Sequence, residues 1–215
     1  MTRYSRIVAG EEAHDLGETG LQRAKQWLEF TTRVDQCWTR HDRPAGELLE
    51  FQWPHGRDDG PGARFSFDLG GTFRGDTLEN QSFVAEVKAY KKENDLPTHF
   101  RDFLAKCYVA LETRPDRCDH FLWLSWSPFQ AQRWDQHATA ENVRKSVLHE
   151  ANRRRTLGLE DESQAAAKLS ADLLVGVAER IWLVTLSEKQ EQLVLSANHY
   201  VEVVRMITLE RRGAA

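Results

Sequence analysis

The sequence predicts an α/β fold in which a mixed central β-sheet is flanked by helices and followed by a mostly helical C-terminal part. Two helical patterns, at residues 19–30 and 96–112, enclose a segment rich in strand signals. The run 121–126 is apolar on both faces, as is typical of a strand inside a sheet. Beyond residue 139 the apolar spacing is mainly helical, with a late strand at 181–186. This order of elements indicates helices packed against a sheet.

The first predicted helix covers residues 19–30 and has a start signal of its own. Thr19 and Gln22 have the spacing of a capping box, in which the two side chains satisfy backbone N–H groups at the start of a helix. Strands are predicted next at 34–38 and 48–53, and a loop rich in glycine and proline follows them.

Residues 64–69 alternate between apolar and polar side chains. Phe65, Phe67 and Leu69 are therefore predicted on one face of a strand and Asp68 on the other. The glycines that follow predict a turn between this strand and the next one.

The segment 83–90 also alternates, which places Glu86 and Lys88 on one face of a strand. The amphipathic pattern at 96–112 follows, with Pro97 in its first turn, where proline is tolerated.

In the C-terminal part, helices are predicted at 141–155, 163–179 and 188–198, whereas 200–209 fits either a strand or a helix. We expect residues 1–138 to form the α/β core and residues 139–215 to form a helical part packed on the same domain.

Composition limits the classes of protein that this chain can belong to. Its 215 residues, 40% hydrophobic and 29% charged, fit a globular domain with a core. The N-terminal residues show no secretion signal and no apolar run is long enough to span a bilayer, so we expect a cytoplasmic protein without membrane contact. Three cysteines without paired spacing predict neither a disulfide framework nor a cysteine zinc site. The net charge of −4 argues against coating DNA as the main activity.

One pair of strands carries residues suited to metal chemistry. If the two strands pair, Asp68 lies beside Glu86, and Lys88 lies about 6.6 Å further along the same face. Two neighbouring carboxylates repel unless a cation lies between them, and oxygen-only ligands suit Mg²⁺ or Mn²⁺. The carbonyl of Val87 can add a ligand. Lys88 can orient or deprotonate an attacking water, or stabilise charge on a phosphate.

Asp68, followed 18 positions later by Glu86-Val87-Lys88 on an apolar strand and then by an amphipathic helix, resembles the core of the PD-(D/E)XK nuclease superfamily. Phe67 stands where that pattern often has proline. The resemblance implies a restriction endonuclease-like core, metal ligation by Asp68 and Glu86, a catalytic Lys88, and cleavage that leaves 5′-phosphate and 3′-hydroxyl ends. It also implies a glutamate from the first helix, for which Glu18 is the candidate and Glu29 the fallback.

The expected substrate is nucleic acid, DNA rather than RNA. Lys91 and Lys92 after the second strand, and Arg153 and Arg154 in a basic helix, are the candidates for contacts with the phosphate backbone. The competing interpretation is that both groups of basic residues lie on solvent-exposed surface and contact no ligand. The resemblance suggests a bacterial role in phage defence, restriction or repair, as a homodimer or with a partner protein.

Three alternatives remain open on the sequence. The chain could be an inactive nuclease-fold subunit that binds DNA or a partner. Asp68-Leu69-Gly70-Gly71-Thr72 also resembles the phosphate-binding turn of actin-like sugar kinases, which would make the chain a phosphotransferase. Glu86 and Lys88 could instead form a surface pair on an interaction domain.

Overall fold

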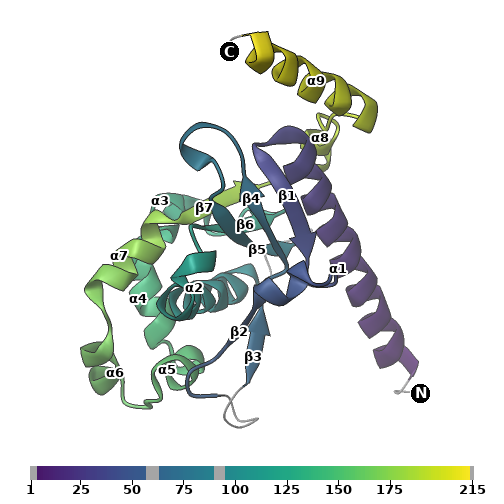
Figure 1. Ribbon diagram of the computed structural model, residues 1–215. Helices are drawn as coiled ribbons and strands as arrows, with labels where there is room; N and C mark the ends of the chain where they lie inside the picture. The colour runs from purple at the N-terminus through teal and green to yellow at the C-terminus, as the bar shows by residue number, and fades with distance from the viewer. Residues whose placement is uncertain (1–3, 57–62, 90–94, 214–215) are drawn as a thin grey trace.

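The computed structural model describes residues 4–56, 63–89 and 95–213, and within them it contains a central sheet with helices on both sides (Figure 1). The sheet has five strands in the order β1-β4-β5-β6-β7. They are β1 (Val34–Thr39), β4 (Leu69–Phe73), β5 (Ser82–Lys88), β6 (His120–Ser125) and β7 (Ile181–Thr185). The pairs β1–β4 and β4–β5 are antiparallel, whereas β5–β6 and β6–β7 are parallel. The predicted mixed α/β fold is confirmed.

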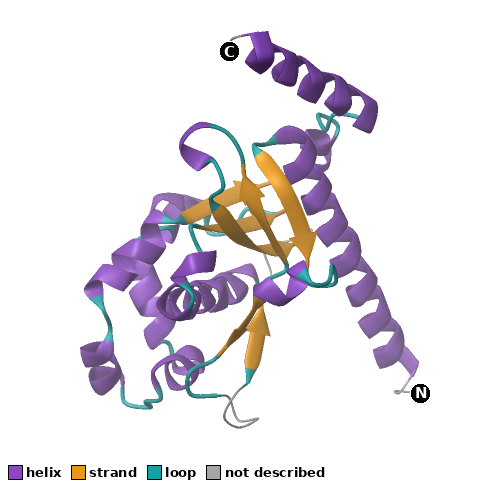
Figure 2. Cartoon of the chain, viewed as in Figure 1, coloured by secondary structure: helices purple, strands orange, loops and turns teal. Residues whose placement is uncertain are grey.

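Two short strands, β2 (Glu50–Gln52) and β3 (Arg64–Ser66), form a separate antiparallel pair beside this sheet. Figure 2 shows how the helices surround both sheets. The α-helices are α1 (Tyr4–Thr31), α2 (Leu96–Thr113), α3 (Trp134–His137), α4 (Ala140–Leu148), α5 (Glu150–Leu157), α6 (Glu162–Lys168), α7 (Ala171–Glu179), α8 (Glu188–Glu191) and α9 (Ala197–Gly213). Short 3₁₀ helices lie at Ala45–Leu49, Asp76–Leu78, Pro115–Arg117 and Ala131–Arg133.

Apolar side chains cover both faces of the central sheet. On one face, Leu21, Ala24 and Leu28 of α1 pack with Phe83 and Ala85 of β5. The opposite face is covered by α2, with α4 and α7 packed behind it. Phe103 and Trp123, both fully buried, belong to this second and larger cluster. A strand covered on both faces loses most of its contact with water, so polar side chains on β5 must find partners inside the protein.

The first helix is longer than predicted. α1 begins at Tyr4, so Thr19 and Gln22 lie in its middle and form no capping box. The segment before Thr19 has no proline and several good helix formers, and each isolated glycine within a helix costs only about 1 kcal/mol.

The predicted strand 64–69 is in fact two strands, β3 and β4, that meet at Asp68. Phe67 packs in the cluster beneath α2 and Leu69 in the cluster beneath α1, so they do not share a face as predicted. The backbone turns between the two sheets because the Phe67 amide donates to Leu49 O (3.1 Å) and the Asp68 amide donates to Ala85 O (2.9 Å).

The predicted turn at Gly70, Gly71 and Gly75 is wrong for the first two glycines, because both lie inside β4. Both positions need glycine for space. A Cβ on Gly70 would lie 2.4 Å from a methyl carbon of Leu49, and one on Gly71 would lie 2.2 Å from the Gln36 carbonyl oxygen. Gly75, with a φ of +84°, does lie in the turn, as predicted.

Two of the predicted C-terminal helices are each split in two. The helix at 141–155 ends at Leu148, and α5 restarts after His149, whose ring accepts from the Ala151 amide. The helix at 163–179 breaks before Ser170, whose hydroxyl caps α7. Side chains that bond to a backbone N–H start a new helix more readily than they continue an old one. Of the predicted helix 188–198, Glu188–Glu191 forms α8 and the last two residues begin α9. The ambiguous segment 200–209 also belongs to α9.

The C-terminal part is joined to the core by the sheet itself. β7, from the segment 139–215, is the parallel neighbour of β6. α9 reaches back to α1, where the Tyr200 and Phe30 rings meet edge to face at 5.1 Å. Within the described part of the chain, no helix is long and apolar enough to cross a membrane.

Candidate functional site

The structure brings Asp68 and Glu86 together at the end of β5. Asp68 lies at the junction of β3 and β4, and its Oδ2 accepts a hydrogen bond from the Val87 amide at 2.9 Å. The Asp68 amide donates to Ala85 O at 2.9 Å, which fixes the backbone on both sides of Glu86. The segment that carries Asp68 pairs with β5, as the sequence predicts, and this pairing brings the Asp68 and Glu86 carboxylates close together.

Glu86 is buried, with 7% of its surface exposed, on the face of the sheet that α2 covers. The Lys88 Nζ lies 2.9 Å from Glu86 Oε1, as expected for residues two apart on one face of a strand. A buried carboxylate is stable in the ionised form only when charged or hydrogen-bonding groups surround it, and Lys88 supplies one of them.

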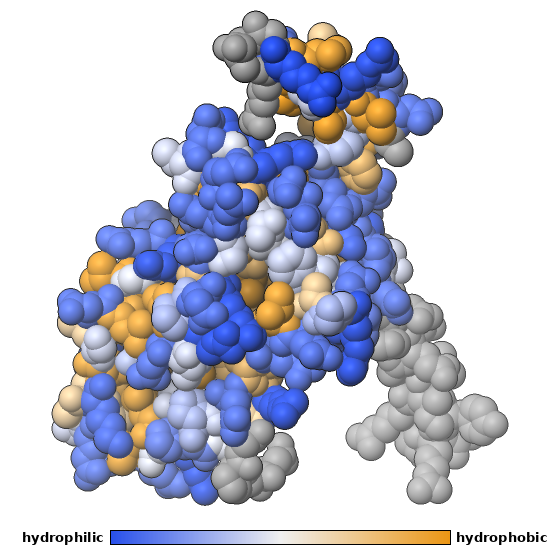
Figure 3. Space-filling view, viewed as in Figure 1, coloured by the Kyte–Doolittle hydropathy of each residue, from blue (hydrophilic) through white to orange (hydrophobic). Residues whose placement is uncertain are grey.

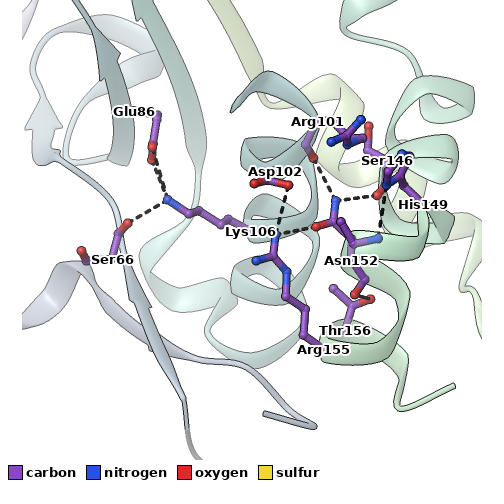
Figure 4. A network of polar contacts seen from close by, with 11 residues as sticks. Ser66, Glu86, Arg101, Asp102, Lys106, Ser146, His149, Asn152, Arg155 and Thr156 are labelled. Atoms are coloured by element: carbon purple, nitrogen blue, oxygen red, sulfur yellow. Dashed lines mark hydrogen bonds and ion pairs between the residues drawn. The ribbon is translucent and has the colours of Figure 1, made fainter. Parts of the chain in front are cut away.

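The second cation at Glu86 is Lys106, which the sequence analysis missed. Its Nζ lies 3.2 Å from Oε1 and 3.0 Å from Oε2 of Glu86, and 3.2 Å from the carbonyl oxygen of Ser66 (Figure 4). Lys106 extends from α2 across the sheet, and its side chain is 19% exposed. A signal for it exists in the sequence: Lys106 is the one charged residue between Asp102 and Glu112. A lone lysine in an apolar stretch of a buried helix predicts a buried acidic partner.

The charges of this cluster shift the pKa values of its two carboxylates in opposite directions. Burial, and then the negative charge of Glu86, raise the pKa of Asp68 above its ordinary value. Burial alone would also raise the pKa of Glu86, but Lys106 and Lys88 together hold this pKa below its ordinary value. The cluster therefore holds one carboxylate firmly ionised and a second that gains a proton more easily.

His99 is a further titratable group near the cluster. It lies seven residues before Lys106 on α2, which is two turns along the same face. Burial, and then the positive charge of Lys88, lower the pKa of His99. The imidazole is therefore biased toward its neutral form.

Neither glutamate candidate from the first helix is brought to Asp68 and Glu86. Gly20 faces the end of β5, since a Cβ there would lie 2.3 Å from the Cβ of Ala89. Glu18 is two residues earlier, about 200° around the helix, and it is exposed. Glu29, the fallback, has Lys25 and Asp42 as its charged neighbours, and burial raises its pKa.

Of the basic residues predicted to contact nucleic acid, the described ones, Arg153 and Arg154, are not gathered at this cluster. Lys91 and Lys92 lie outside the described residues. Arg153 and Arg154 lie on α5, where Arg153 pairs with Glu162 at 3.4 Å and Arg154 with Glu160 at 3.5 Å. Both pairs are partly exposed, so they contribute little to stability and leave the positive charge accessible.

Arg155, next to them, has a structural role. It is only 5% exposed. Its guanidinium lies 3.1 Å from Asp102 Oδ1 and 4.2 Å from the ring centroid of Trp53. Figure 4 shows that Asp102 points from α2 toward α5, while Lys106, one turn further along α2, points toward Glu86. The contacts of Asp102 with α5 and of Lys106 with β5 thus fix α2 between the two.

The donor atoms at the cluster fit a Mg²⁺-type site. Asp68 and Glu86 supply carboxylates. The backbone of Ala85 and Val87 faces the Asp68 side of β5, so the Val87 carbonyl points toward the same space. Among the described residues no group of three Asp, Glu, His or Cys side chains could hold a metal. Mg²⁺ is nevertheless commonly held by one or two carboxylates while keeping several waters. The hydrogen bonds of Lys88 and Lys106 are the obstacle, because they occupy the Glu86 oxygens.

The geometry does not favour the phosphotransferase alternative. Gly70 and Gly71 lie inside β4, where Leu49 and Phe83 occupy the space that a Cβ would need. A phosphate-binding turn needs glycine backbone exposed to the ligand, and here it faces packed side chains.

Comparison of this chain with protein-family models, with curated proteins and with solved structures finds no match.

Proposed function

We propose that this chain is a divalent-metal-dependent nuclease with a restriction endonuclease-like core that hydrolyses DNA phosphodiesters. The observation that carries the proposal is the position of Asp68, Glu86 and Lys88 at the end of β5, with the two carboxylates adjacent and the lysine ammonium 2.9 Å from Glu86. The sheet supports the proposal, because β1, β4 and β5 are antiparallel, β6 and β7 then run parallel to β5, and α2 follows β5 in the chain.

Each residue has a role that its chemistry allows. Asp68, Glu86 and the carbonyl of Val87 would hold Mg²⁺ or Mn²⁺, which when bound polarises a phosphate and lowers the pKa of a water. Lys88 would orient the attacking water or donate a hydrogen bond to the charge that develops on the phosphate. Burial strengthens such interactions, because water does not screen charges there as it does at the surface.

The choice of DNA, and of a cytoplasmic role in defence, restriction or repair, rests on the resemblance of the motif. Positive charge for the phosphate backbone is local rather than global, since the chain carries a net charge of −4. Arg153 and Arg154 on α5 are the described candidates for such contacts.

The second candidate function is an inactive nuclease-fold subunit that binds DNA or a protein. The observation that favours it is that Lys88 and Lys106 already neutralise Glu86 without a metal. The test is incubation of purified protein with plasmid DNA, linear DNA and RNA in Mg²⁺ or Mn²⁺, beside an Asp68→Asn variant. Cleavage by wild type that needs metal and Asp68 supports the nuclease. DNA binding without cleavage in any condition supports the inactive subunit.

We also propose that α9 mediates self-association. Figure 3 shows apolar side chains on α9, where Val201, Met206 and Leu209 are each more than half exposed. Light scattering on the full chain and on a chain that ends at Ser196 tests whether α9 joins two copies. A dimeric mass that becomes monomeric on truncation supports this, whereas an identical oligomeric state contradicts it.

A further inference from the structure

Lys106 and a divalent metal would need the same two oxygen atoms. The Nζ of Lys106 approaches both carboxylate oxygens of Glu86, at 3.2 and 3.0 Å. A metal that took the lone pairs of Glu86 to which Lys106 donates would lie about 2.0–2.1 Å from one of these oxygens and would contact the Lys106 ammonium. Like charges at that separation repel strongly in a site that is largely shielded from water.

Lys106 also has a second acceptor within reach. Besides Glu86, it donates to the Ser66 carbonyl oxygen at 3.2 Å, and its Nζ lies 5.9 Å from the ring centroid of Phe67. An ammonium that leaves Glu86 therefore keeps an acceptor and a favourable ring face nearby. A lysine stem has several rotatable bonds, so the ammonium can move by a few ångströms without movement of α2.

We propose that Lys106 is a resident counterion of Glu86 that a divalent metal displaces, and that the displaced ammonium binds a phosphate of the substrate. This inference rests on the proposed nuclease function. In the metal-free chain Lys106 keeps the buried carboxylate neutralised. In the loaded chain, the same positive charge becomes available next to the place where the anionic substrate must enter.

Charge complementarity supports the exchange. With Lys88 and Lys106 in place, the two lysines balance Asp68 and Glu86. A bound divalent cation makes the cluster positive by two charges, and a phosphodiester supplies negative charge in return. The ammonium of Lys106, which is not among the proposed metal ligands, could contact that phosphate beside Lys88 without loss of a metal ligand.

The experiment measures Mn²⁺ affinity by titration calorimetry for wild type, Lys106→Met, Lys106→Arg and Lys145→Met. Lys145 is a matched control, since it is an exposed helical lysine paired with Glu141. Removing the competing ammonium is expected to tighten Mn²⁺ binding by about ten- to a hundred-fold, the range that a charged hydrogen bond provides. Lys106→Arg and Lys145→Met are expected to bind as wild type does. Circular dichroism checks that each variant is folded.

A second arm measures binding of a short DNA duplex in Ca²⁺. Lys106→Met is expected to bind this duplex several-fold more weakly although it binds metal more tightly, a pair of opposite effects that a packing defect does not produce. Equal Mn²⁺ affinity in wild type and Lys106→Met would overturn the inference and leave the nuclease proposal standing. Unchanged duplex affinity would overturn the phosphate contact. No Mn²⁺ binding by any protein would overturn both the inference and the proposed function.

Discussion

The ammonium of Lys106 lies between both carboxylate oxygens of Glu86, at 3.2 and 3.0 Å, and thereby ties the central helix α2 to the central strand β5. The same carboxylate accepts from Lys88 at 2.9 Å. Glu86 is thus the residue on which the charge balance of the site depends, and changes at this position are expected to affect stability as well as activity.

Glu86→Gln is expected to destabilise the fold by roughly 2–3 kcal/mol at pH 7, because two partly buried lysines lose their anionic partner. The pKa of Glu86 is lowered in the folded state, so ionised Glu86 adds stability above its unfolded pKa of about 4.5, and this stability is lost as the pH falls through the lower folded pKa. Urea unfolding between pH 3 and 7 measures this. If the variant loses stability with acid as steeply as wild type does, Glu86 is not the titrating group.

Asp68→Asn is expected to change the stability of the fold in the opposite direction to Glu86→Gln. Burial and the charge of Glu86 raise the pKa of Asp68, so its ionised form weakens the fold as the pH rises from the unfolded pKa of about 3.8 through the higher folded pKa. Asparagine keeps the acceptor for the Val87 amide and removes the charge. The variant is predicted to be more stable than wild type at pH 7 and to approach it below pH 4 in the same urea series. A variant less stable at pH 7 would contradict the assigned repulsion.

His99 is expected to titrate below its ordinary pKa of about 6.5, because burial and the charge of Lys88 both disfavour its protonated form. Lys88→Met removes one of these two causes, so the pKa of His99 should rise in that variant while remaining below the ordinary value. Proton NMR of the imidazole across pH 4–8 gives both midpoints. Identical midpoints in the two proteins would show that Lys88 is too far away to act on His99.

Gly71→Ala tests the assignment of the glycine pair to a strand. Its added Cβ would lie 2.2 Å from the Gln36 carbonyl oxygen and 2.5 Å from the Phe83 ring, so a loss of about 2–4 kcal/mol is expected. Gly17→Ala is the matched control, since nothing lies within 4 Å of a Cβ there and helix propensity predicts a gain of about 1 kcal/mol. Thermal unfolding of both variants gives the comparison. A harmless Gly71→Ala would point to an open turn.

Local periodicity was enough to predict several elements. The limits of β6 and α2, to within one residue at each end, follow from side-chain spacing within single segments. So does the alternation that places Glu86 and Lys88 on one face of β5. To predict that Asp68 lies near Glu86, it was enough to assume that two segments neighbouring in the sequence pair with each other.

Features that depend on three-dimensional packing were not predictable in this way. The division of 64–69 into β3 and β4 arises because Phe67 and Leu69 serve cores on opposite faces of the sheet, although their spacing alone suggests one face. Lys106 was missed because its partner Glu86 lies 20 residues earlier on another element. The glycines of β4 suggested a turn because the side chains that press on them come from other segments.

The most direct test of the nuclease proposal is metal-dependent nicking of supercoiled plasmid by wild type, Lys88→Met and Glu50→Gln. Glu50 is an exposed glutamate on β2 that pairs with Arg64, so its substitution controls for handling and surface charge. We predict cutting by wild type and Glu50→Gln in Mg²⁺ or Mn²⁺, no cutting in EDTA, and a rate at least about 10²-fold lower for Lys88→Met. Equal cutting by folded Lys88→Met, or cutting that persists in EDTA, would contradict the proposal.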